Sequence, residues 1–248
     1  ALAARDTAGA KICICGKISR GYSPQQAPAR VSFLRYRNSA TMPSANPGPI
    51  IGKVNGPAGR LETSLSLAHT NSDSGRFAVL CHPHPQFGGT MHDAILDIAE
   101  RALLASGSHC LRFNFRGVGA SEGVHDGQAE ADDVAAVVAW VLAEHAPDRL
   151  ILVGYSFGAA MVWHALDRIA TPTQVLLIAP PIGSMTLPER SPGCPVDVVA
   201  GDRDQFVDTS ALAAWQGVSA HTLVGADHFF SRQWQELEAR LLELLQNA

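Results

Sequence analysis

Short apolar runs alternate with amphipathic segments from Phe77 to the C-terminus of this 248-residue chain. The apolar runs have the length of strands buried on both faces, and the segments between them have helical spacing. The predicted strands are Phe77–Cys81, His109–Phe115, Leu150–Val153, Gln174–Ala179, Val196–Ala200 and 221–224. The predicted helices are Asp93–Ala105, Gly127–Glu144, Phe157–Ile169, Thr209–Trp215 and 231–246. This alternation predicts the α/β class, with a mostly parallel central sheet and helices on both faces.

Two strands are predicted before this alternation begins. Residues 50–54 and 60–68 are rich in strand formers and are separated by the turn formers of Asn55–Gly59. This pattern predicts an antiparallel pair at the N-terminal side of the sheet. We therefore expect residues 49–248 to form one domain, which is a common length for a single α/β domain.

The first 48 residues are predicted to lie outside the fold as a disordered extension. They show no sustained hydrophobic period, and residues 1–41 hold seven Lys or Arg against the single acid Asp6. An Arg-rich, acid-poor segment resembles an organellar transit peptide. A translated upstream stretch ahead of Met42, or a segment added in cloning, fits equally well.

Charge and hydropathy exclude several classes of partner. The longest apolar run, Val134–Ala143, is far shorter than the roughly 20 residues of a membrane-spanning helix, so no membrane insertion is expected. The chain carries a formal net charge of −4, and beyond residue 41 its one lysine is Lys53. A body this acidic has no basic stripe for a phosphate backbone, so nucleic acid is not an expected partner.

The five cysteines point to a reducing compartment. They are odd in number and contain no Cys-x-x-Cys pair, which predicts neither a disulfide framework nor a zinc site. Cys81 and Cys110 fall within predicted strands and are interpreted as small core residues. We therefore expect a cytoplasmic protein without a metal.

The strongest chemical signal is Gly154-Tyr155-Ser156-Phe157-Gly158, between an apolar strand and a predicted helix. A serine at such a sharp turn needs small neighbours two residues away on each side, because the flanking chains pass close together. The turn exposes the hydroxyl and directs the N-terminus of the helix at a developing oxyanion. Ser156 is therefore the predicted nucleophile, and the Phe157 amide is a predicted oxyanion donor.

A serine hydroxyl needs a general base and a third group that orients the base. With a turn of this kind, these partners follow in the order Ser, acid, His. Asp204 and His228 each come just after a predicted strand, at the sheet edge where Ser156 also lies. His228 is therefore the predicted base and Asp204 the predicted acid, with Asp202 and Asp208 as competitors for the acid role. Four further residues are interpreted as structural or loop residues: Ser121, His164, His221 and Asp227.

Five segments together resemble the α/β-hydrolase superfamily, nearest to small lidless bacterial serine hydrolases related to dienelactone hydrolase. They are CHPHPQFGG, RFNFRGVGASEG, GYSFG, GDRDQFV and GADHFF, and the resemblance extends from residue 50 to the end. It implies the α/β-hydrolase fold. Dienelactone hydrolase has a cysteine where this chain has Ser156, so the special substrate of that enzyme does not carry over.

The resemblance also implies a second oxyanion donor in the loop after the Phe77–Cys81 strand. Prolines have no N–H, so His84 is the first candidate and Gln86 the second. Relatives with a cap domain carry it after the strand that corresponds to 174–179, and here only Pro181–Pro195 is available. No cap domain is therefore expected, and an open site favours short or accessible acyl groups.

These observations predict a serine esterase that acts through an acyl-enzyme and needs no cofactor. The expected partner is a small carboxylic ester, with a thioester next. A peptidase is an alternative because the same groups cleave amides, and a non-catalytic binding module on the same fold is another.

Overall fold

The computed structural model describes residues 48–68, 75–189, 192–212, 215 and 217–246. The described residues form one compact unit. The predicted extension of residues 1–48 lies outside the described residues, except for Gly48.

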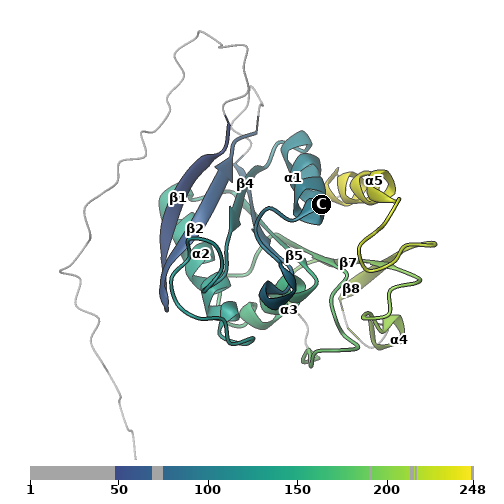
Figure 1. Ribbon diagram of the computed structural model, residues 1–248. Coiled ribbons are helices and arrows are strands. Elements are labelled where there is room, and N and C mark those ends of the chain that lie inside the picture. Colours follow the sequence, from purple (N-terminus) through teal and green to yellow (C-terminus); the bar gives the residue numbers. More distant parts are fainter. Residues whose placement is uncertain (1–47, 69–74, 190–191, 213–214, 216, 247–248) are drawn as a thin grey trace, which may run out of the picture. The chain divides into compact units, whose positions relative to one another are not determined.

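An eight-stranded sheet forms the centre of this unit, in the order β1-β2-β4-β3-β5-β6-β7-β8. The strands are β1 (Ile50–Gly56), β2 (Gly59–Ser66), β3 (Arg76–Cys81), β4 (His109–Phe113), β5 (Arg149–Tyr155), β6 (Gln174–Ile178), β7 (Val196–Gly201) and β8 (Val218–Leu223). Pairing is antiparallel from β1 to β2 and from β2 to β4, and parallel in every other pair. The mostly parallel sheet with antiparallel first strands is confirmed (Figure 1).

Helices cover the sheet in two pairs. They are α1 (Ala94–Ala105), α2 (Glu130–His145), α3 (Phe157–Ala165), the short α4 (Thr209–Leu212) and α5 (Trp234–Gln246), with a 3-10 turn at Pro85–Phe87. Helix α1 packs against α5, and α2 packs against α3 (Figure 1). Such helices bury the apolar strands on both faces, as the α/β class requires.

Side-chain and loop hydrogen bonds shorten two predicted strands. The Ala68 amide donates to Nδ1 of His109 at 3.0 Å, and β2 ends at Ser66 instead of residue 68. The Phe115 amide donates to Nε2 of His82 at 3.1 Å, and β4 ends at Phe113 instead of Phe115.

Two predicted helices begin three residues later in the structure. Helix α2 begins at Glu130, not Gly127, because the Asp126 carboxylate first accepts the amides of Gln128 and Ala129 in a turn. Helix α5 begins at Trp234, not residue 231, after a segment in which Phe230 and Arg232 have positive φ angles of 51° and 65°.

Two more predicted boundaries are wrong. Helix α3 ends at Ala165, not Ile169, because the Leu166 amide bonds to the Trp163 carbonyl and closes the last turn in 3-10 fashion. Strand β8 begins at Val218, not residue 221, because it pairs with β7 from Val218 onward.

The segment between β6 and β7 is too short for a cap domain. Its described part, 179–189 and 192–195, contains no helix or strand. The expectation of a fold without a cap domain is therefore confirmed. Among the described residues, no helix has the length and apolar character needed to cross a membrane.

Candidate active site

Ser156 occupies a sharp turn between β5 and α3. Its backbone has φ 52° and ψ −117°, a conformation that a non-glycine residue rarely adopts and that costs on the order of 1–3 kcal/mol. The Ser156 amide donates to the Ile178 carbonyl of β6 at 2.9 Å. This bond ties the strained residue to the neighbouring strand, so the surrounding sheet maintains the turn.

The two flanking glycines are required by close backbone contacts. A Cβ on Gly154 would lie 2.5 Å from the Cα of Ala159, and a Cβ on Gly158 would lie 2.2 Å from the Cys81 carbonyl oxygen. Real Cβ atoms essentially never come this close to backbone atoms. The expected close passage of chains around the serine is therefore confirmed.

Three side chains that the sequence singled out meet at this turn. Nε2 of His228 lies 2.9 Å from Oγ of Ser156, and Nδ1 of His228 lies 2.7 Å from Oδ2 of Asp204. The Asp204 side chain is fully buried, and its other oxygen accepts the Phe206 amide at 2.9 Å. A buried carboxylate on Nδ1 makes Nδ1 the donor, so the lone pair on Nε2 faces the serine hydroxyl.

Aromatic rings enclose His228 and fix its plane. The ring of Phe206 lies 4.8 Å from the imidazole and the ring of Phe229 lies 5.5 Å away. The Tyr155 hydroxyl donates to the His228 carbonyl at 3.1 Å, and burial raises the pKa of this tyrosine above its usual range. Tyr155 is therefore a neutral donor that holds the His228 backbone next to Ser156.

The competing acids are engaged elsewhere. Asp202 accepts the Gly225 amide at 2.6 Å, and Asp208 accepts the Ser210 amide at 3.0 Å. Asp227 accepts the amide of Ser231 at 2.9 Å within its own loop. The structure therefore brings Asp204, and neither Asp202 nor Asp208, to His228.

The remaining singled-out residues have local partners. Ser121 Oγ donates to the Asn114 carbonyl at 2.7 Å. His221 lies in the middle of β8, not at its start, and pairs with Asp197. His164 lies in α3. These placements agree with loop and structural roles.

The candidate oxyanion donors come from two elements, the start of α3 and the loop after β3. Phe157 is the first residue of α3, and His84 precedes the 3-10 turn. Within the described part of the chain, neither amide donates to an acceptor. The Gln86 amide donates to Nδ1 of His84 at 3.2 Å. This bond favours His84 over Gln86 as the second donor, because the amide of His84 has no competing acceptor.

A second histidine that the sequence did not single out lies beside these donors. The His125 ring lies 5.1 Å from the ring of His84 and 5.6 Å from the ring of Phe157. Its Nδ1 lies 2.6 Å from Oε1 of Glu130. The only sequence signal was a glutamate five residues after a histidine, in a loop that leads into a helix. A spacing of five residues matches neither helix nor strand periodicity, so the sequence gives no sign that the two side chains meet.

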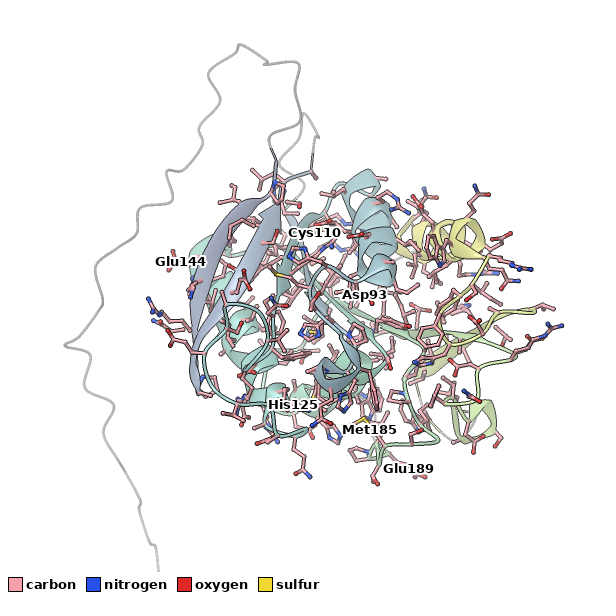
Figure 2. The ribbon with its side chains drawn as sticks, viewed as in Figure 1. Asp93, Cys110, His125, Glu144, Met185 and Glu189 are labelled. Carbon is pink, nitrogen blue, oxygen red and sulfur yellow. The ribbon has the colours of Figure 1, made fainter. Side chains whose placement is uncertain are left out.

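Two open cavities lie on either side of β5 in the sheet order. One, of about 370 Å³, lies between the loops that follow β3 and β4, and His125 lines it. The other, of about 420 Å³, is lined by the segment after β6, including Met185 and Glu189, and by Trp215. Figure 2 shows His125, Met185 and Glu189 toward the same end of the molecule.

The described cysteines are buried or half-buried, and burial raises the pKa of the thiols of Cys81, Cys110 and Cys194. They therefore remain protonated and unreactive at neutral pH. Cys13 and Cys15 lie outside the described residues. Across the described ranges, no group of three or more His, Cys, Asp or Glu is placed to hold a metal ion.

Comparison with known proteins identifies the family. The family model described as alpha/beta hydrolase fold matches residues 84–179. An uncharacterised protein of Rickettsia prowazekii (strain Madrid E) is 31% identical over 208 residues, which cover 77% of this chain and 86% of that protein.

Solved structures agree with this assignment. A serine hydrolase without a lid from Xanthomonas campestris is 32% identical, with a TM-score of 0.75 over 84% of this chain and 97% of that chain. A serine hydrolase homologue from Coxiella burnetii is 31% identical, with a TM-score of 0.71 over 84% of this chain and 100% of that chain. The narrower kinship to dienelactone hydrolase stays a prediction. The chain therefore belongs to the α/β-hydrolase superfamily.

Proposed function

We propose that this chain is a serine hydrolase that cleaves small carboxylic esters through an acyl-enzyme on Ser156. The observation that carries the proposal is the continuous hydrogen-bonded path from Oγ of Ser156 through the His228 imidazole to the buried Asp204 carboxylate, at 2.9 and 2.7 Å. This arrangement lets His228 remove the serine proton while Asp204 stabilises the imidazolium that forms.

The proposed reaction has two stages, acylation of Ser156 and deacylation. In the first, Oγ of Ser156 attacks the ester carbonyl, His228 accepts the proton, and the amides of Phe157 and His84 stabilise the oxyanion. The proton then passes from His228 to the departing alcohol oxygen as the ester bond breaks. In the second stage, water attacks the acyl-enzyme, His228 takes its proton and returns it to Oγ, and the free acid leaves.

The surroundings of Ser156 favour a small or accessible substrate. The described part of the segment between β6 and β7 forms no lid, and the two cavities on either side of β5 in the sheet order are open. The residues of the proposed path supply proton transfer and charge stabilisation, so these steps use no cofactor. The described cysteines are free thiols, which supports the proposal of a reducing, cytoplasmic setting.

The test is hydrolysis of p-nitrophenyl acetate, butyrate and octanoate by the wild type and by Ser156→Ala, with fluorophosphonate labelling of both proteins. We expect saturable turnover that falls at least about 10⁴-fold in the variant, and labelling that disappears with it. A decline in kcat/KM from butyrate to octanoate is expected for a small site. Undiminished turnover in Ser156→Ala, or a wild type that neither labels nor turns over, would overturn the proposal and favour a binding module.

A further inference from the structure

The pair of His125 and Glu130 is a half-buried imidazole on a buried carboxylate, beside the proposed oxyanion donors. The Glu130 side chain is fully buried, and the His125 side chain is 13% exposed. Oε1 of Glu130 lies 2.6 Å from Nδ1 of His125 and also accepts the Asp126 amide at 3.0 Å. Oε2 accepts the Gly127 amide at 3.0 Å. A buried carboxylate with this many donors fixes the imidazole firmly.

The hydrogen-bond pattern also fixes the tautomer of His125. Because the Glu130 carboxylate is an acceptor, Nδ1 of His125 is the donor, and the lone pair of the neutral ring lies on Nε2. His228 has the same tautomer for the same reason, since Asp204 holds its Nδ1. At His228 the lone pair meets the Ser156 hydroxyl. At His125, no described residue provides a hydroxyl or any other partner for Nε2.

Ring packing prevents His125 from turning away. Its ring meets those of His84 and Phe157 edge-on, with interplanar angles of 72° and 69°. His84 and Phe157 themselves lie 4.8 Å apart. The three rings therefore form one packed cluster, and Glu130 contacts it through Nδ1 of His125. Burial lowers the pKa of His84, which keeps that ring neutral in the cluster.

The cavity in front of His125 can receive part of a substrate. It measures about 370 Å³, and four of the nine residues that line it are glycines of the loops after β3 and β4. Glycine lining leaves room that side chains would fill elsewhere. His125 is the one imidazole among these lining residues.

We propose that His125, oriented by Glu130, is a specificity residue whose Nε2 accepts a hydrogen bond from a hydroxyl group of the substrate. The preferred substrates would then be small esters that carry a free hydroxyl on the acyl chain or on the alcohol. This inference rests on the proposed ester hydrolysis at Ser156. One neutral hydrogen bond in an open cavity changes kcat/KM by about threefold to tenfold.

The first measurement compares matched substrates on the wild type. For the acyl side, p-nitrophenyl 3-hydroxybutyrate is compared with p-nitrophenyl butyrate. For the alcohol side, 2-hydroxyethyl butyrate is compared with ethyl butyrate. Each kcat/KM is divided by the rate constant of hydroxide-catalysed hydrolysis, which removes differences in intrinsic reactivity. We expect the hydroxylated ester to be preferred by about threefold to tenfold in one of the two pairs. A ratio near one in both pairs would overturn the proposal.

The second measurement removes the imidazole nitrogens with His125→Phe. We expect the preference to fall to about one while hydrolysis of the plain ester continues. The matched control is His221→Phe, which removes a ring that is also held by a carboxylate but lies within β8. It should keep the wild-type preference. A preference that survives in His125→Phe would assign hydroxyl recognition to another group and overturn the role of His125.

Fluorophosphonate labelling separates this inference from the proposed function. Labelling of wild type and His125→Phe without any hydroxyl preference means that hydrolysis at Ser156 stands and the role of His125 fails. If His125→Phe gives no cooperative thermal unfolding, His125→Asn takes its place, because its amide is too short to replace Nε2, and the same ratios decide. A wild type that does not label overturns the proposed function itself.

Discussion

Strands β7 and β8 and the loops that follow them contain two histidine and carboxylate pairs that differ in geometry. His221 pairs with Asp197 at 2.9 Å, and His228 pairs with Asp204 at 2.7 Å. In each pair the two partners are 24 residues apart in sequence. The first pair lies within the strands, and the second lies beyond their carboxyl ends.

The two pairs differ in the ring nitrogen that contacts the carboxylate. Asp197 takes Nε2 of His221, and its other oxygen accepts the Gln174 side-chain amide at 3.1 Å. Asp204 takes Nδ1 of His228, so Nε2 remains for the Ser156 hydroxyl. General-base chemistry of the proposed kind needs a nucleophile at the second ring nitrogen, and parallel strands bring such groups together at their carboxyl ends.

The largest effect should come from removing the base. His228→Ala should lower kcat by about 10⁵- to 10⁶-fold, because the serine hydroxyl loses its proton acceptor. The matched variant His221→Ala should keep kcat within about twofold of the wild type. Both are measured with p-nitrophenyl butyrate at pH 7.5. Equal losses in the two variants would remove the distinction between the pairs.

The next effect concerns the orienting carboxylate. Asp204→Asn keeps an oxygen for the Phe206 amide but lets the side-chain amide favour the opposite tautomer of His228, with the proton on Nε2. We expect kcat to fall by about 10⁴-fold with the fold intact. The control is Asp202→Asn, since the Asp202 carboxylate meets the Gly225 amide and not His228. A loss below about tenfold in Asp204→Asn would exclude an orienting role for that residue.

The order of strands and helices was predictable from sequence, because apolar runs and helical spacing record burial directly. The boundaries of β8 and α5 were not. β8 is an edge strand made of exposed and half-buried residues, so its pairing with β7 leaves little apolar signal. The start of α5 depends on a loop in which Asp227 accepts the Ser231 amide. Such a bond has no hydrophobic period.

The meeting of Ser156, Asp204 and His228 was predictable because each follows a parallel strand, and parallel strands have their carboxyl ends at the same edge of the sheet. The choice of Asp204 over Asp202 was not fixed by the sequence. It depends on the direction of single carboxylates within a tight loop. His125 and Glu130 escaped prediction for a related reason, since loop geometry brings them together.

A third histidine, His82, has backbone partners and, among the described residues, no carboxylate, so it shows the effect of burial alone on a histidine pKa. His82 is fully buried, its Nε2 accepts the Phe115 amide at 3.1 Å, and burial lowers its pKa to about 4. A histidine in the unfolded chain has a pKa of about 6.5, so between this pH and about pH 4 it is protonated while the native His82 is neutral. Its contribution to stability is therefore complete above pH 6.5 and is lost progressively toward pH 4, by about 3 kcal/mol in total.

Urea unfolding of the wild type and of His82→Gln at pH 7.5, 5.5 and 4.2 measures this contribution. The glutamine oxygen can still accept the Phe115 amide but does not titrate. We expect the free energy of unfolding to depend less on pH in the variant, by about 2 to 3 kcal/mol across this range. The same pH dependence in both proteins would show that His82 takes up its proton in the native state.

The smallest change in free energy is expected at the pair of Asp197 and His221, within β7 and β8. Asp197→Asn weakens the bonds to His221 and Gln174, and we expect the free energy of unfolding at pH 7.5 to fall by about 1 to 2 kcal/mol. Turnover should stay within about twofold of the wild type, because this pair has no contact with Ser156 among the hydrogen bonds of the described residues. Urea unfolding and the p-nitrophenyl butyrate assay on one preparation measure both quantities. A large loss of turnover without a loss of stability would mean that Asp197 acts on the site, and the two pairs would then no longer differ in the way proposed.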